Sequence, residues 1–555
     1  MTVHGRRRKH WGWGYEDQQP SLANLRRAAP AIRDRLGFGG EPEEPVALER
    51  IDLPPPRLRP PSGLAEIMRD DRHERVSHSL GKAYRDVVRG MRGRIDHPPD
   101  LVARPRDEGE VEAVLAWCAD AGAAAIPFGG GTSVVGGVEP RLGDGYAGAV
   151  SVDLGALDRV LEVDPVSRAA RVGAGVLGPA LNEQLAASGL TLRHFPQSFE
   201  LSTLGGWIAT RAGGHYATVW THIDDLVESV RAITPAGAWE SRRVPGSGAG
   251  PSPDRMLIGS EGILGVITEA WIRVHERPRH KLSVGVGFDS FARGAAAVRE
   301  LAQSGLNPAN CRLLDPVEAE VTGAGPPGRA LLVLGFESAH HPVDAQLEVA
   351  LEAARDHGGE AGEVRGRGRR GAGDARRPAA PGRGAEEPAG GDSRWRDAFL
   401  AAPYLRDTLV ACGVLTETLE TAITWERFGE FHAAVAGAAR KAAAEASGVP
   451  AEGDGAPKVS CRLTHVYPDG PAPYYTILAP AQRGSEVEQW DEVKAAVSEA
   501  LIAAGGTITH HHAVGRDHRP WYDRQRPEPF AAALRAAKRA VDPAATLNPG
   551  VLIDP

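Results

Sequence analysis

The sequence predicts an α+β protein built from at least two domains. A strand, a helix and a second strand follow one another from residue 101, and the second strand runs into a glycine-rich loop. Further loops rich in small residues follow before residue 270, and beyond residue 280 mixed strands alternate with alanine-rich helices. With 555 residues, 42% of them hydrophobic and 25% charged, the chain is long enough for several hydrophobic cores.

Composition excludes several classes of protein. The 64 Lys and Arg residues against 72 Asp and Glu give a net charge of -8, so no global field favours nucleic acid. Four cysteines without CxxC spacing suit a reducing compartment and argue against structural zinc. Since no uncharged apolar run reaches about 18 residues, we expect a cytoplasmic protein.

Residues 1–95 form the first region. They are polar and rich in proline, apart from the aromatic motif Trp11-Gly12-Trp13-Gly14-Tyr15. Such text is typical of a linker with helices on the surface. We therefore expect the ordered core to begin near Asp96.

A second region, residues 96–280, opens with the strand–helix–strand pattern. A strand is expected at 101–105, and Asp107 can cap a helix with apolar residues at positions 111, 114, 115 and 118. The second strand, 123–127, leads into the loop 128–137, which contains five glycines. A glycine loop after a strand lets backbone N–H groups face a phosphate without interference from Cβ atoms.

Two other phosphate motifs compete with this interpretation. The loop lacks the Gly-Lys-Ser/Thr of a Walker A loop, which excludes an ordinary kinase or ATPase site. Residues 173–178 satisfy GxGxxG, after a strand at 169–172 and ahead of Glu200. Because Pro179 and Asn182 suit an ordinary helix start, we favour that interpretation and keep a dinucleotide site as the alternative.

Two further small-residue loops follow. One covers residues 202–214, preceded by His194-Phe195-Pro196-Gln197-Ser198, and the other covers residues 259–269. Strand-like text at 227–234 separates them. Three such loops in order suit one extended ligand with several polar parts better than a single phosphate.

The third region, residues 281–500, reads as an α+β domain. It contains a strand at 331–336 and helices at 345–354 and 431–446. Residues 362–392 differ, because seven Arg, nine Gly and no aromatic residue cannot bury an apolar face. We expect a disordered, solvated insert, with an RNA-binding arm as the weaker alternative.

A histidine triplet, His510-His511-His512, is a candidate for chemistry. It follows a turn and a segment with the composition of a strand. In a strand, the side chain of His511 would point to the face opposite that of His510 and His512. A metal ion would need another ligand, such as Asp517 or His518, and no cluster at ligand spacing supplies it. We therefore predict proton handling or anion binding, and no metal.

Tyrosine and arginine residues add to these candidates. Tyr474 and Tyr475 lie in strand-like text and should point to opposite faces. Arg312 and Arg406 are charged residues within apolar segments of the sequence. Each can pair with a nearby Asp, or can bind phosphate or carboxylate through its two-pronged guanidinium.

Taken together, these motifs resemble the vanillyl-alcohol-oxidase-type flavoproteins, and within them the alkylglycerone-phosphate synthase family. The resemblance runs from the aromatic motif near Trp11 to residues 541–543, and it rests on the loops and the histidine triplet quoted above. It implies a two-subdomain FAD-binding domain (PCMH/VAO-type) at 96–280. It also implies an α+β substrate (cap) domain at 281–500 and a C-terminal segment, 501–555, that returns to the FAD site.

The resemblance implies an extended FAD molecule. With no His or Cys in the first loop, we expect it to be held non-covalently. The implied cofactor residues are Pro127, Phe128, Gly129, Gly130, Gly131, Thr132, Ser133, Gln197, Ser198, Phe199, Glu200, Leu201, Ser202, Thr203, Thr210, Arg211, Ala212, Gly213, Glu261, Gly262, Ile263, Leu264, Gly265, Val266 and Ile267.

The resemblance also implies a reaction. In this family a fatty alcohol replaces the acyl group of acyl-dihydroxyacetone phosphate, through an adduct on flavin N5 and without net redox change. Tyr474 matches the acid/base residue, Arg406 matches the substrate-binding arginine, and Arg312 an arginine needed for activity. His194 and the triplet at 510–512 match active-site histidines. The partners would be lipid substrates and no nucleic acid, with peripheral membrane contact plausible and a homodimer left open.

The chain departs from the family pattern at two places. Gln197 stands where the family has Asp, and the insert at 362–392 has no counterpart in that pattern. Some of the same loops occur in D-lactate and glycolate dehydrogenases. An FAD-linked 2-hydroxyacid dehydrogenase, with Arg406 on the carboxylate and a histidine as base, is therefore the alternative function.

Overall fold

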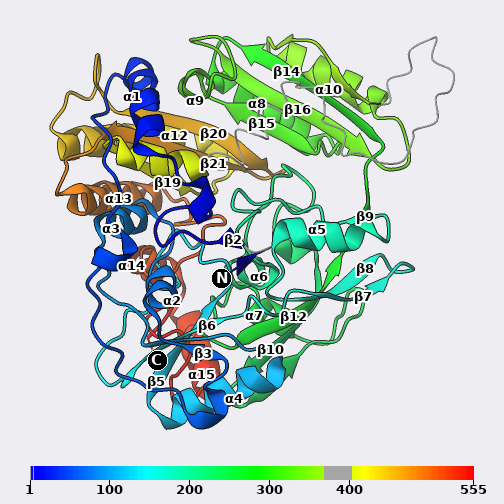
Figure 1. Cartoon of the computed structure of the whole chain (residues 1–555). Coiled ribbons are helices and arrows are strands. Elements are labelled where there is room, and N and C mark those ends of the chain that lie inside the picture. The colour runs from blue at the N-terminus through cyan, green and yellow to red at the C-terminus, as the bar shows by residue number, and fades with distance from the viewer. Residues whose placement is uncertain (1, 4–5, 368–402, 555) are drawn as a thin grey trace.

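The computed structural model describes residues 2–3, 6–367 and 403–554. Figure 1 shows the arrangement: a large sheet with its helices lies at the top, and smaller sheets lie below it. The N-terminal segment reaches the region between these two parts.

The first sheet of the lower part contains the predicted strand–helix–strand unit. Its order is β3-β4-β6-β5, with β3 at Met68–Arg69, β4 at Leu101–Ala103, β5 at Ala123–Phe128 and β6 at Gly148–Asp153. Strands β4, β5 and β6 are parallel. Helix α4 (Glu108–Asp120) begins at the predicted cap, where the Asp107 side chain accepts from the Glu110 N–H at 2.9 Å. The sequence-based assignment of this unit is confirmed.

The second sheet of the lower part is antiparallel, in the order β11-β10-β12-β8-β7. Its strands are β7 (Val160–Asp164), β8 (Ala169–Gly173), β10 (Val227–Thr234), β11 (Gly237–Glu240) and β12 (Val266–Arg273). The GxGxxG run ends β8 and starts α5 (Gly178–Ala186). A Cβ on Gly175 would lie 1.9 Å from the Leu154 carbonyl oxygen, so this glycine serves close backbone packing.

The upper part is one antiparallel sheet in the order β17-β14-β16-β15-β20-β21-β19, with β18 beside β14. Its strands are β14 (His280–Phe288), β15 (Asn310–Leu314), β16 (Ala330–Ser338), β17 (Glu360–Ala361), β18 (Arg365–Arg367), β19 (Val414–Glu420), β20 (Lys458–Val466) and β21 (Pro471–Pro480). Helices α8 (Phe291–Gln303), α10 (Asp344–Asp356), α12 (Trp425–Ser447) and α13 (Glu486–Ala503) accompany it.

The remaining elements are short or terminal. They are β1 (Thr2–Val3), β2 (Arg6–Arg7), α1 (Leu22–Leu36), α2 (Arg72–Ser77), α3 (Tyr84–Arg92), β9 (Leu190–Thr191), α6 (Leu204–Thr210), α7 (Pro253–Leu257), β13 (His275–Glu276), α9 (Pro316–Thr322), α14 (Arg519–Gln525) and α15 (Glu528–Val541), with 3-10 turns at Glu16–Gln18, Leu48–Arg50, Ser62–Leu64 and Ile223–Asp225.

The N-terminal region does not form the expected linker with surface helices. Trp11, Trp13 and Tyr15 are 3%, 4% and 6% exposed and belong to the same hydrophobic core as the large sheet. Helix α3 is also buried along most of its length. The expectation that order begins near Asp96 was wrong. The proline-rich segments between these elements make the region polar on average, although the elements themselves bury apolar side chains.

Part of the predicted insert is ordered. Residues 365–367 form β18 and pair with β14, with Gly366 opposite Leu282. A Cβ on Gly366 would lie 1.9 Å from the Lys281 carbonyl oxygen, so the glycine here permits close strand contact. The disorder expected for 362–392 was therefore wrong at these residues, and positions 368–392 lie outside the described residues.

The last part of the chain packs against the first sheet. Leu547 forms a parallel bridge with Ala125 of β5, and the Ala125 N–H donates to the Thr546 carbonyl at 2.8 Å. The Asn548 side chain donates to the Glu261 carbonyl at 2.7 Å. C-terminal residues thereby reach the glycine-rich loops.

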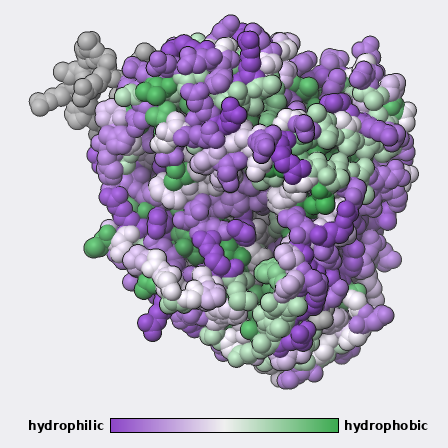
Figure 2. Space-filling view, turned by 180° about the vertical axis from the view of Figure 1, so that it is seen from behind, coloured by the Kyte–Doolittle hydropathy of each residue, from purple (hydrophilic) through white to green (hydrophobic). Residues whose placement is uncertain are grey.

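The surface is mixed in character. Figure 2 shows hydrophilic residues interspersed with small hydrophobic areas on the rear face. Within residues 6–367 and 403–554, no helix combines the length and apolar character needed to cross a membrane.

Candidate active site

A cavity of about 600 Å³ lies between the glycine-rich loops and strands β19, β20 and β21. It is open at one side and mostly apolar, with a few charged and histidine side chains in its wall. The implied cofactor residues that line it are Pro127, Phe128, Gly129, Gly130, Gly131, Thr132, Ser133, Gln197, Ser198, Ser202, Thr203, Thr210, Ala212, Gly213, Glu261, Gly262, Gly265 and Ile267. All of the predicted loops thus meet at one cavity.

The glycine loop leaves no room for side chains where it meets its neighbour. A Cβ on Gly129 would lie 2.2 Å from Thr203 Oγ1, and one on Gly130 would lie 2.1 Å from the Leu201 carbonyl oxygen. Glycine is therefore required for the loops at 127–133 and 197–203 to touch. This cradle of bare backbone fits the diphosphate part of FAD, and the long cavity beside it fits the rest of an extended dinucleotide.

The other implied cofactor residues support the loops from behind, and Ile263, Leu264 and Val266 are buried in the core of this domain. The Phe199 ring stacks on Trp207 with centroids 6.1 Å apart, while the Arg211 guanidinium turns to Asp224 at 2.9 Å. Glu200 accepts from the Tyr404 hydroxyl at 2.6 Å. None of these side chains, nor that of Leu201, is part of the cavity wall.

Tyr474 lies on the cavity face of β21, whereas Tyr475 points to the opposite face, as the alternation predicts. The Arg462 guanidinium stacks on the Tyr474 ring, with its central carbon 3.8 Å from the ring centroid. Arg462 itself is held by Glu318 at 2.6 Å. A fixed cation therefore lies against the ring on which a phenolate charge would develop.

The histidine triplet does not form the expected strand. It is a bend whose three backbone N–H groups converge on one carboxylate, that of Glu420 at the end of β19. His511 and His512 donate from their backbone at 2.9 and 2.7 Å. The backbone N–H groups of the triplet donate to the buried Glu420 carboxylate and not to a neighbouring strand. The side chains therefore do not alternate between two faces as they would in a strand.

The bend places the three imidazoles differently. His511 and His512 line the cavity, while His510 lies behind them and contacts the Tyr467 hydroxyl at 2.8 Å. Burial holds the pKa of all three imidazoles well below the ordinary value of 6.5. They are therefore neutral at physiological pH, with one nitrogen able to accept and the other to donate.

One group of imidazoles has the spacing of a metal site. Nitrogen atoms of His465, His510 and His511 lie within 4.8 Å of one another. The Nδ1 atoms of His510 and His511 face each other at 3.0 Å, and His465 Nε2 contacts the Gly214 carbonyl at 2.8 Å. We interpret this group as a hydrogen-bonded cluster, and the absence of a metal stays a prediction.

The two arginines differ in position. Arg406 lines the cavity, and its guanidinium donates to the Lys82 carbonyl at 3.2 Å and to Thr418 Oγ1 at 3.1 Å. Arg312 is fully buried in β15, outside the cavity wall, with a contact to the His215 carbonyl at 3.4 Å. The structure thus brings Arg406, and not Arg312, to the cavity.

His194 also lies outside the cavity wall. It is completely buried and packs against Trp207, with ring centroids 5.2 Å apart. Burial lowers its pKa to about 3. Here it supports the loop at 213–214, since a Cβ on Gly214 would meet its Nδ1 at 3.0 Å.

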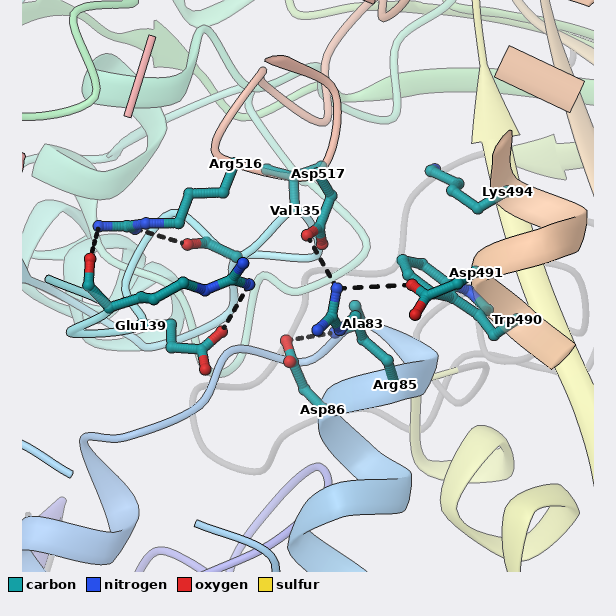
Figure 3. Close-up of polar contacts among 12 residues, drawn as sticks. Ala83, Arg85, Asp86, Val135, Glu139, Trp490, Asp491, Lys494, Arg516 and Asp517 are labelled. Carbon is teal, nitrogen blue, oxygen red and sulfur yellow. Dashed lines mark hydrogen bonds and ion pairs between the residues drawn. The ribbon is translucent and has the colours of Figure 1, made fainter. Parts of the chain in front are cut away.

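The loop after the histidines is fixed by a network of charges (Figure 3). Arg85 of α3 lies between Asp517, at 3.4 Å, and Asp491 of α13, at 3.6 Å. Its guanidinium also lies 5.5 Å from the centroid of the Trp490 ring. On the other side, Arg516 donates to the Gly136 carbonyl at 2.9 Å. These contacts tie the histidine loop to the first glycine loop and to the cap.

Sequence reasoning missed several residues of the site. Glu420 and Arg462 were not singled out, although Arg462 lines the cavity and Glu420 holds the triplet. Trp13 was noted as part of the aromatic motif, but not as a residue of the cavity wall. The alternation of Thr416, Thr418 and Glu420 along β19 was an available signal for a polar face. The aromatic motif marked Trp13, but its place in the cavity wall could not be predicted, because the segment that it contacts lies far away in sequence.

Two families of known proteins match parts of the chain. The FAD binding domain family matches residues 99–241, and the family described as FAD linked oxidases, C-terminal domain, matches residues 277–552. The cofactor is therefore FAD, and the predicted fold class is confirmed. Its non-covalent attachment stays a prediction.

Individual relatives are similar over nearly the whole chain. An alkyldihydroxyacetonephosphate synthase from Dictyostelium discoideum is 30% identical, covering 94% of this chain and 87% of the relative. A mitochondrial D-lactate dehydrogenase (cytochrome) from Arabidopsis thaliana is 25% identical, covering 82% of this chain and 74% of the relative. A solved alkyldihydroxyacetonephosphate synthase shares the fold with a TM-score of 0.76 at 24% identity, covering 98% of this chain and 97% of that chain.

Proposed function

The chain belongs to the alkyldihydroxyacetonephosphate synthase family, and from this premise we propose that it exchanges the acyl group of an acyl-dihydroxyacetone phosphate for a fatty alcohol. The observation that carries the proposal is the single cavity. It joins the FAD loops to Arg406, Tyr474, His511 and His512, and it continues along apolar side chains. A cofactor, an anion, an acid/base group and a lipid chain can meet there.

Arg406 would bind the phosphate of the substrate. Two of its N–H groups are already directed to Lys82 and Thr418, which fixes the plane of the guanidinium. The remaining N–H groups can form the two-pronged contact that suits phosphate. Apolar residues such as Leu409, Val317 and Val321 line the cavity as well and suit an alkyl or acyl chain.

Proton transfer would fall to Tyr474 and the histidines. Tyr474 can hold or release the phenolic proton next to a carbonyl compound, and the Arg462 guanidinium stacks on its ring. His511 and His512 are neutral, so each can donate a hydrogen bond to a departing carboxylate. When bound, FAD would supply an electron-accepting ring system.

Two further properties are proposed on the same basis. A long-chain substrate resides in membranes, so the enzyme would contact a membrane peripherally when it takes up substrate. The scattered cysteines, which are all free and buried, suit a reducing compartment such as the cytoplasm.

An assay of the holoprotein distinguishes this function from the alternative. Purified protein is incubated with palmitoyl-dihydroxyacetone phosphate and labelled hexadecanol, and separately with D-lactate. We expect a labelled alkyl product and no flavin reduction by D-lactate. Flavin reduction by a 2-hydroxy acid, without alkyl product, would favour the dehydrogenase that the likeness to D-lactate dehydrogenase suggests.

A further inference from the structure

The aromatic motif at 11–15 and the three residues before it, 8–10, have no role in the function described so far, yet they lie at the site. Trp13 is part of the cavity wall. The Arg8 guanidinium donates to the carbonyls of Gly130 and Leu201, the latter at 2.8 Å, and so joins the cofactor loops at 127–133 and 197–203. The N-terminal segment is thus in contact with the FAD cradle.

The same segment contacts the helical residues 403–411, which include Arg406. Lys9 Nζ lies 2.5 Å from Asp407 Oδ2, and both side chains are almost completely buried, at 2% and 1% exposure. The Trp13 backbone N–H donates to the same oxygen at 2.8 Å. A Cβ on Gly12 would meet that carboxylate at 2.4 Å, so only glycine allows the segment to pass this close.

A second contact fixes the start of this helical stretch. The Tyr404 hydroxyl donates to Glu200 at 2.6 Å, and a Cβ on Gly14 would lie 2.7 Å from the Tyr404 ring. Arg406 therefore stands between two anchored neighbours, Tyr404 and Asp407. Its direction depends on contacts made by residues near the other end of the chain.

We propose that Lys9 is a positioning residue for substrate binding, acting through Asp407 to hold Arg406 in the cavity. The inference rests on the proposed function of Arg406 as the ligand of the anionic end. Breaking a buried pair leaves a poorly compensated charge. Without the Lys9 ammonium, the Asp407 carboxylate would keep only the Trp13 N–H and the Lys82 charge among the partners that the structure describes, and the arginine next to it would shift. Affinity for the anion should fall, while the chemical step at Tyr474 should change little.

The test measures binding of dihydroxyacetone phosphate to the holoprotein through the change it causes in the flavin spectrum. We expect Lys9→Met to raise Kd and KM about tenfold, a loss near 1.4 kcal/mol, with kcat within about twofold. Arg7→Met is the matched control, because among the described residues the Arg7 side chain forms an exposed ion pair with Glu16 at 3.7 Å and none with the segment that carries Arg406. It should leave Kd unchanged.

Two further variants isolate the route. In an Arg406→Met background, Lys9→Met should cause no further loss of affinity. In the parent chain, Lys9→Arg keeps the positive charge and should therefore lose less affinity than Lys9→Met. If Lys9→Met folds poorly, the pair Lys9→Met with Asp407→Asn removes both charges and should still weaken binding.

Additive effects, an unchanged Kd in folded Lys9 variants, or a loss confined to FAD content would overturn the inference. If the protein binds the probe through Arg406 but forms no alkyl product, the proposed reaction fails while the positioning role stands.

Discussion

Tyr474 illustrates how the surroundings of one residue give it a chemical role. Both Tyr474 and Tyr475 are buried in β21, but only Tyr474 shares its face with the cavity, Arg462 and the histidine bend. Tyr475 instead meets His432 of α12 at 3.2 Å. The two tyrosines are therefore a natural pair of test and control.

Replacing Tyr474 with Phe should abolish most of the activity. The change removes the group that exchanges a proton, and general acid–base catalysis contributes about 10²- to 10⁴-fold. We expect kcat to fall at least about 100-fold, with FAD content unchanged. Tyr475→Phe should leave kcat within about twofold of the parent. Equal losses in both variants would show that packing of the strand, not proton transfer, is responsible.

Glu420 gives the site a dependence on pH. Its carboxylate receives three backbone N–H groups of the triplet, yet burial raises its pKa to about 7 from an ordinary value of 4.5. A carboxyl whose folded pKa is raised favours the folded state most when it is protonated. Its contribution to stability is therefore complete below pH 4.5 and is lost as pH rises through about 7.

Comparison with Glu420→Gln checks this sign. The free energy of unfolding of the parent, relative to the variant, should decrease as pH rises from about 5 to about 8. Thermal unfolding of the FAD-loaded proteins across that range measures the difference. A difference that is flat, or that grows with pH, would contradict a raised pKa for this carboxyl.

At the scale of elements, the cofactor site depends on loops that touch without side chains between them. The contact of Gly130 with the carbonyl of Leu201 is the tightest of these. Gly130→Ala would place a Cβ 2.1 Å from that oxygen and 2.8 Å from Ser202 Cα, and neither backbone atom can move alone. We expect the variant to retain less than about a tenth of its FAD, which corresponds to more than about 1.4 kcal/mol.

A glycine in an open position provides the control for that variant. Gly143 has nothing within 4 Å of an added Cβ, so Gly143→Ala should purify with the same flavin absorbance as the parent. Full FAD content in Gly130→Ala would show that the two loops separate at low cost. That result would remove the steric argument for the cradle.

Elements whose signal is local could be predicted from the sequence. The Asp107 cap, β10 and the strand that enters the glycine loop follow from patterns within a few residues. The histidine bend could not be predicted, because its shape is set by Glu420, about 90 positions earlier in the chain. Side chains alternate between two faces only where the backbone pairs with another strand. Here the backbone N–H groups bind a buried carboxylate instead.

At the scale of the whole molecule, the chain ends complete the site. Lys9 and Asp407 are 398 positions apart, and Arg85 and Asp517 are 432 apart. A single sequence shows no periodicity or spacing that would reveal such distant pairs. For this reason the sequence predicted a linker in the N-terminal region. The loops, Tyr474 and Arg406 were found through their motifs, whereas the contacts that orient them required the structure.

The cavity also accounts for the division into two parts. One part supplies the FAD loops and the other supplies Arg406, Tyr474 and Arg462, so substrate must lie between them. In the proposed reaction one carbon–oxygen bond is exchanged for another in this space, without net oxidation.

The most direct measurement of this claim uses hexadecanol labelled with ¹⁸O. The holoprotein is incubated with palmitoyl-dihydroxyacetone phosphate and no electron acceptor, and the products are weighed by mass spectrometry. We expect an alkyl product that retains the label, unlabelled palmitate, and flavin that is oxidised at the end. Permanently bleached flavin with no labelled ether would contradict it.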